Sequence, residues 1–218
     1  LNQKINTTIL TSIKLETYNI WIHIRGEELK SMILEGKKIG FALTGSFCTF
    51  KKTIPQIAKL IEEGAEVLPI MSFNSYNINS RFGEANEFIK KIEEITNKKI
   101  INKIEEAEII GAKHLTDIMV IAPCSRKHNG IVDTPVLTAA KSNLRNENPL
   151  VIGIATNDGL STSLENIGKL ISRKNIYFIP FRQDNPITKP HSLMFEPNYI
   201  LNTVLEALNG MQIQPILL

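Results

Sequence analysis

Apolar and polar positions along the chain form blocks that predict strands and helices in alternation. Five short runs are almost continuously apolar, which is the pattern of strands covered on both faces. We predict buried strands over 38–43, 66–71, 118–122, 150–155 and 176–179. Pro123 follows the third run directly and is predicted to end that strand.

The segments between these runs carry apolar residues every three or four positions, as in helices packed on a sheet. Gly64 is predicted to end a helix with Ile54, Ile57 and Leu60 on its inner face. The other predicted helices cover 84–95, 134–144, a segment after Thr162 and 199–208. Thr134 and Pro135 form a helix start, and Thr162 and Glu165 have the spacing of a capping box.

Buried strands separated by helices predict right-handed parallel crossovers. The predicted fold is therefore α/β: a doubly wound, mostly parallel sheet of five or more strands in a flavodoxin- or Rossmann-like three-layer sandwich. Ligands on such sheets bind at the carboxyl ends of the strands, where the strand order reverses. The residues that follow each strand are thus the candidate site residues.

Composition narrows the class of protein without identifying it. The chain has 218 residues, 43% of them hydrophobic, and a formal net charge of +3. The lysines are scattered, so no nucleic-acid partner is expected. Two cysteines do not make a disulfide scaffold, the four histidines lack ligand spacing for a metal, and no apolar run spans a membrane. We expect a cytoplasmic protein.

Residues 1–31 read differently from the rest, with no clean periodicity. Arg25 to Glu28 can be encoded by a purine-only run that resembles a bacterial ribosome-binding site, and Met32 follows shortly after. We predict that translation starts at Met32, that 1–31 is an upstream-translated extension, and that 32–218 is a single domain. The alternative is a genuine helix or strand that docks on the body.

The first strand ends in a small, hydroxyl-rich turn at 44–49. Gly45 permits close backbone approach, and the hydroxyls of Thr44, Ser46 and Thr49 sit at a helix start, which suits a phosphate. The turn matches neither the dinucleotide fingerprint nor a Walker loop. A plain strand-to-helix turn with a serine cap is the alternative.

The later strand ends offer further polar groups. The 72–77 segment is a loop that either reaches over a ligand or lies on the surface. Residues 122–125 with Asn129 offer hydrogen bonds to a planar heterocycle, and Cys124 is either a nucleophile or a small buried thiol. Asp133 and Asp158 form an acid–base pair or cap helices.

Three motifs together resemble a known family. Gly-Phe-Ala-Leu-Thr-Gly-Ser at 40–46, Val-Ile-Ala-Pro-Cys-Ser at 120–125 and Asn-Gly-Ile-Val-Asp at 129–133 are similar to the flavoprotein family of flavin-containing cysteine decarboxylases. The segments 133–141, 156–158 and 174–181 resemble in particular the branch of dipicolinate synthase B subunits. The resemblance covers about 33–218.

The resemblance implies an FMN site. On it, Thr44, Gly45 and Ser46 hold the phosphate, Ser72 touches the ribityl–phosphate region, and Ala122, Pro123, Cys124, Ser125 and Asn129 line the flavin. It also implies a homo-oligomer in the mother cell of a sporulating bacterium. There an NAD(P)-binding partner, the dipicolinate synthase A subunit, would join it as an oxidoreductase that forms dipicolinate from a dihydrodipicolinate precursor. No residue is indicated as the proton carrier.

Two departures from the family pattern leave alternatives open. Glu108, Ile109 and Ile110 occupy the region of the decarboxylases' catalytic histidine, which disfavours decarboxylation. The loop between Ser125 and Asn129 is shorter than the family's. The chain is then either a flavin-binding enzyme subunit or an assembly subunit that keeps the fold without flavin. A flavin-dependent decarboxylase is the third and weakest interpretation.

Overall fold

A computed structural model of the chain describes residues 32–125 and 134–218. The chain divides after Ile33, and residues 34–218 form one folded unit. The prediction of an upstream extension over 1–31 therefore concerns residues outside the described part.

The unit is built on one seven-stranded sheet with the order β2-β1-β3-β4-β7-β6, and β5 pairs with β4. β1 to β5 pair in parallel, whereas β7 is antiparallel to both β4 and β6. The strands are β1 Lys38–Leu43, β2 Glu66–Met71, β3 Ile118–Cys124, β4 Leu150–Thr156, β5 Ile176–Phe178, β6 Phe181–Arg182 and β7 Leu193–Phe195.

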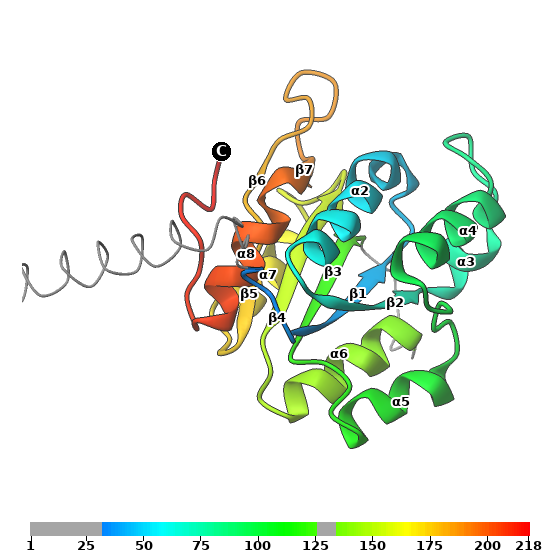
Figure 1. Cartoon of the computed structure of the whole chain (residues 1–218). Coiled ribbons are helices and arrows are strands. Elements are labelled where there is room, and N and C mark those ends of the chain that lie inside the picture. Colours follow the sequence, from blue (N-terminus) through cyan, green and yellow to red (C-terminus); the bar gives the residue numbers. More distant parts are fainter. Residues whose placement is uncertain (1–31, 126–133) are drawn as a thin grey trace, which may run out of the picture. The chain divides into compact units, whose positions relative to one another are not determined.

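Helices cover both faces of the sheet (Figure 1). α5 and α6 pack together on one face, and α2 and α8 lie on the other. The α-helices are α2 Phe50–Glu62, α3 Phe73–Asn77, α4 Ala85–Thr96, α5 Ile104–Ala112, α6 Pro135–Arg145, α7 Leu164–Ile171 and α8 Ile200–Leu208. Two short 3₁₀ helices, η1 Phe47–Thr49 and η2 Pro197–Tyr199, precede α2 and α8.

The predicted fold class is confirmed: a mostly parallel sheet lies between two helical layers. The central strands are continuous apolar runs because both of their faces are covered, and Ile39, Phe41 and Val120 have no exposed surface. β1 lies between β2 and β3. The winding direction therefore reverses between β1 and β3, which places the switch point of the fold at their carboxyl ends.

The prediction that Pro123 ends the third strand is wrong. β3 continues to Cys124, and the register against β4 shifts between Ile121 and Cys124. The shift accommodates proline, which has no N–H for the ladder, while the Pro123 carbonyl still accepts a bond from the Thr44 amide at 3.2 Å.

The predicted capping box is also wrong. Ser163, not Thr162, is the N-cap of α7, and it makes no side-chain cap bond. The hydroxyls of Thr162 and Ser163 instead donate to the Asp158 carboxylate at 3.1 and 3.0 Å. A nearby acceptor thus outcompetes the local capping pattern.

Several short elements were absent from the sequence prediction. α3 forms at Phe73–Asn77, where the sequence predicts a loop, and the sequence pattern predicts no element at α5, β6 or β7. β5 and β7 share one edge of β4: β5 pairs with Leu150 to Ile152, and β7 pairs with Ala155 and Thr156.

The contact between α5 and α6 predicts the effect of a single methyl group. A Cβ added at Gly111 would lie 2.8 Å from both the Cβ and the carbonyl oxygen of Ser142. Because backbone cannot give way cheaply, we expect Gly111→Ala to lower the free energy of unfolding by about 1–3 kcal/mol. Urea denaturation measures it, with the exposed Glu108→Ala on the same helix as control, expected within about 0.5 kcal/mol of the parent. Equal stabilities would contradict this packing.

Candidate functional site

The hydroxyl of Thr44 joins the carboxyl ends of β1 and β3. Its Oγ1 donates to the Pro123 carbonyl at 2.8 Å and accepts the Ser125 amide at 2.9 Å. The Ser125 hydroxyl lies 2.8 Å from the same oxygen. Residues 79 to 81 positions apart in sequence are thereby fixed side by side at the switch point.

Ser46 extends this arrangement to a third strand. Its hydroxyl donates to the carbonyl of Ala155 in β4 at 2.8 Å, and Thr49 Oγ1 donates to the Ser46 carbonyl at 2.9 Å. The ends of β1, β3 and β4 are therefore brought together, as their place in the sequence predicted. The hydroxyl hydrogens of Ser46 and Thr49 are used inside the protein, so hydroxyl donation to a ligand is not what this turn presents.

The turn presents backbone amides instead. Among the described residues, no hydrogen bond uses the amides of Gly45, Ser46, Phe47 or Cys48 as donors. They are successive N–H groups at the start of η1 and α2, where a helix leaves its first donors without partners. Such a group of amides is a general binding site for anions. The helix start is the sequence feature that points to the amides of Phe47 and Cys48. The prediction for this turn names hydroxyl groups and leaves these two residues out.

Within the described residues, the space beside Gly45 is open. A Cβ added at Gly45 would meet nothing closer than the Ser125 hydroxyl, at 3.9 Å. The fold therefore does not require glycine here for packing. The missing side chain leaves the amides accessible to a group that approaches the backbone closely.

Ser72, predicted to touch a cofactor, lies at the end of β2 and is 6% exposed. Its hydroxyl accepts the Ser75 amide as the N-cap of α3 and lies 2.7 Å from the Ser75 hydroxyl. Ser75 in turn donates to the Leu43 carbonyl at 2.9 Å. Ser72 thus has a structural role in joining β1 to α3, and its contact with a cofactor stays a prediction.

The segment predicted to line a planar ring is largely enclosed. Ala122 and Pro123 are buried, and Cys124 and Ser125 are half-buried. Desolvation by burial raises the pKa of the Cys124 thiol to about 11. At neutral pH Cys124 is therefore a neutral thiol, which favours the small buried residue over the nucleophile. Asn129 lies outside the described residues.

Asp158 organises the turn after β4. Its carboxylate accepts hydrogen bonds from the hydroxyls of Thr156, Thr162 and Ser163. This arrangement favours the structural role of Asp158 over the acid–base one. Asp133 and His128 lie outside the described residues.

The described histidines do not assemble a metal site. His114 precedes β3 and lies at the amino edge of the sheet, away from the switch point, and His191 is exposed between β6 and β7. Within 32–125 and 134–218, no group of three metal-ligating side chains occurs. No helix in these two ranges is long and apolar enough to cross a membrane.

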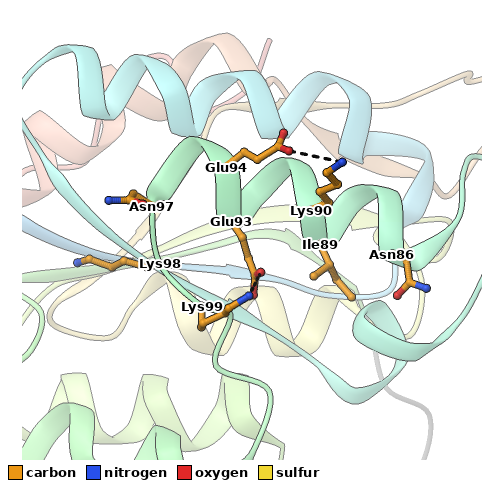
Figure 2. Close-up of a pocket in the computed structure, with 8 residues that line it drawn as sticks. All are labelled: Asn86, Ile89, Lys90, Glu93, Glu94, Asn97, Lys98 and Lys99. Atoms are coloured by element: carbon orange, nitrogen blue, oxygen red, sulfur yellow. Dashed lines mark hydrogen bonds and ion pairs between the residues drawn. The ribbon is translucent and has the colours of Figure 1, made fainter.

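A surface hollow along α4 is a separate feature (Figure 2). Its charged side chains are paired, with Lys99 on Glu93 at 2.7 Å and Lys90 near Glu94 at 3.9 Å. The hydrogen bond from Lys99 holds the pKa of the Glu93 carboxyl below its usual range. Lys98, on the same rim, bonds Glu66 at the amino end of β2. The hollow thus extends toward the edge opposite the strand ends, where this fold class does not bind ligands.

Comparison with known proteins decides the family. The model of the family described as Flavoprotein matches residues 28–209. The chain belongs to the Flavoprotein family. Within this family it is 48% identical over 189 residues to the B subunit of dipicolinate synthase of Bacillus subtilis (strain 168), a match that covers 84% of this chain and 94% of that protein.

Solved structures of this flavoprotein's relatives agree with that assignment. The crystal structure of the dipicolinate synthase B subunit from Bacillus halodurans matches with a TM-score of 0.77 and 44% identity, covering 85% of this chain and 97% of the other. The FMN-dependent cysteine decarboxylase SpaF matches with a TM-score of 0.57 at 17% identity, over 81% and 97% of the two chains, and shows the shared fold alone. The predicted resemblance to the B subunits is confirmed.

The bond network around Thr44 generates a stability prediction. Thr44→Val keeps the shape of the side chain but leaves the Ser125 amide without its bond and the Pro123 carbonyl with the Thr44 amide alone. We expect a loss of about 1–3 kcal/mol in the free energy of unfolding, measured by urea denaturation. Thr44→Ser, which keeps the hydroxyl, should lose much less, and equal losses for the two variants would show that the hydroxyl is not the stabilising group.

The two cysteines should differ in reactivity. Cys48 is exposed on η1, whereas the Cys124 thiol has its pKa raised to about 11. Because the thiolate is the reacting form, a disulfide reagent at neutral pH should modify one thiol rapidly and the second only after unfolding. Cys48→Ser should remove the fast phase. A fast reaction that persists in Cys48→Ser would overturn the assignment of Cys124 as neutral.

Proposed function

We propose that this chain is the B subunit of a dipicolinate synthase. It acts with an NAD(P)-binding A subunit, in the mother cell of a sporulating bacterium, to form dipicolinate from a dihydrodipicolinate precursor. The similarity to two B subunits over more than nine-tenths of their length supports this assignment.

The backbone amides of residues 45–48 are the observation that supports a flavin-binding, catalytic role for this chain. Four successive N–H groups without partners in the described structure lie at the switch point, and at Gly45 the described residues leave room for close approach. This is the chemistry that a cofactor phosphate requires. The buried end of β3 lies beside it, held by Thr44, and offers an apolar wall on which a flavin ring would rest.

The residues present therefore fit FMN. In this assignment the amides of Gly45 and Ser46 hold the phosphate, Thr44 fixes the turn against Pro123 and Ser125, and Ala122 to Ser125 line the ring. Bound FMN supplies a two-electron acceptor for the hydrogen removed from the dihydro precursor. The chain's own part is to bind, to orient and to keep water from the ring. No proton-transfer step is assigned to a described residue, because Cys124 is a neutral thiol and the Asp158 carboxylate accepts hydrogen bonds from hydroxyls of its own turn.

The alternative of a flavin-free assembly role also has an observation in its favour. The hydroxyls of Ser46, Thr49 and Ser72 bond within the protein, so they serve the fold whether or not a cofactor binds. On this view the chain completes the active site of the A subunit without flavin. Dipicolinate formation by the isolated A subunit, compared with formation by the two chains together, separates the two roles. Full activity from the isolated A subunit would exclude an essential catalytic role for this chain.

Decarboxylation is not proposed for this chain. Glu108, Ile109 and Ile110 stand where the histidine of the decarboxylases is expected.

A titration of the full chain with FMN tests the cofactor site directly. We expect saturable binding that shifts the visible absorbance of the flavin. Gly45→Asp should abolish FMN binding, since the new carboxylate would lie in front of the amides and repel the phosphate. Asn157→Asp adds the same charge on an exposed residue after β4 and should bind FMN like the parent. Absence of binding by the parent, or equal binding by both variants, would refute the proposed site.

A further inference from the structure

Helix α7 is amphipathic, yet it buries none of its residues completely. Leu164 and Ile171, on one helical face and two turns apart, are 48% and 44% exposed. Leu160, in the preceding turn, continues the row with 40% exposed. Only Ile167, at the border of this face, packs against the core. An ordinary surface helix turns such a row inward, whereas no element within 32–125 and 134–218 covers the row on α7.

Gly168 lies at the centre of the same face. Glycine inside a helix is unfavourable, and the backbone gives no reason for it here: its φ is not positive, and a Cβ added to it would meet nothing within 4 Å. Nothing in the described part of the chain therefore requires the missing side chain. A small residue in the middle of an apolar row is what a second helix needs in order to cross at short distance.

We propose that this face, defined by Leu160, Leu164, Gly168 and Ile171, binds the same face of a second copy of the chain, with the two α7 helices antiparallel. The row is nearly symmetric about Gly168, with Leu164 four residues before it and Ile171 three after. An antiparallel copy thus sets Leu164 of each chain against Ile171 of the other and brings the two Gly168 residues to the crossing point. Two-fold symmetry of this kind is the commonest form of homo-oligomer.

Charge favours the antiparallel direction and a second copy as the occupant. Glu165 and Lys169 lie one turn apart on the same flank of the row and pair with each other within the helix. Two antiparallel copies would place Glu165 of each beside Lys169 of the other, whereas parallel copies related by a two-fold axis would set this flank against the partner's opposite flank, away from both charges. The self-complementary flank needs no other partner, and the inference is independent of the proposed flavin site.

Sedimentation velocity on the full chain tests the association. We expect a concentration-dependent dimer that Leu164→Glu dissociates, with the dissociation constant raised by at least about tenfold. Ile187→Glu, at a residue 91% exposed between β6 and β7, is the matched control and should dimerise like the parent. Gly168→Leu should also weaken the dimer, because the larger side chain would keep the two helices apart. If the contact were a non-specific apolar one, the same substitution would strengthen it. A chain that stays monomeric, or a dimer that Leu164→Glu leaves intact, would overturn the proposal.

Cysteine cross-linking tests the register and remains informative if Leu164→Glu does not fold. In a Cys48→Ser background, the double variant Leu164→Cys with Ile171→Cys should form a covalent dimer under mild oxidation. Each single variant should not, because the antiparallel register keeps identical positions apart. Cross-linking of the single variants, or none in the double variant, would exclude this arrangement.

Discussion

One side-chain oxygen, Thr44 Oγ1, fixes the relation between the two strands at which the sheet reverses its winding. It bonds to both the carbonyl of Pro123 and the amide of Ser125, on either side of Cys124. Parallel strands hold each other along the ladder but diverge where the ladder ends. The hydroxyl extends the connection past that point. The open amides of 45–48, the enclosed end of β3 and the Ser46 bond to β4 all lie next to this connection.

The sequence predicted well the elements that are determined by neighbouring residues or by burial on both faces of a strand. The 38–43 and 66–71 runs form strands with the expected bounds, since successive residues on both faces of each strand are buried. α2 follows from its apolar period and from Gly64, which has a φ of 93° and so ends the helix where few other residues could. The meeting of 44–46 with 122–125 followed from topology alone, because parallel neighbours end at the same edge.

The parts that could not be predicted depend on partners distant in sequence. β6 and β7 are two and three residues long, and only their pairing with each other and with β4 makes them strands. Thr162 fits a capping pattern, but Asp158 competes for its hydroxyl. The resemblance implies that Ser72 contacts a cofactor, and the structure adds a contact between its hydroxyl and that of Ser75, which no local pattern predicts. A pattern gives the location of such a residue and leaves its hydrogen-bond partner open.

The edge of β4 that β5 and β7 share also bears on whether the protein aggregates at high concentration. A strand with a free edge invites another chain to add to it, which is the first step of β-aggregation. Here β5 covers the first half of that edge and β7 the second, and the ladder then continues from β7 to β6. Beyond β6, the amide of Phe181 bonds the carbonyl of Ile216, and the amide of Leu218 bonds the carbonyl of Phe181. Short antiparallel pieces thus seal the side of the sheet that a purely parallel fold would leave open, and they protect it from intermolecular strand exchange.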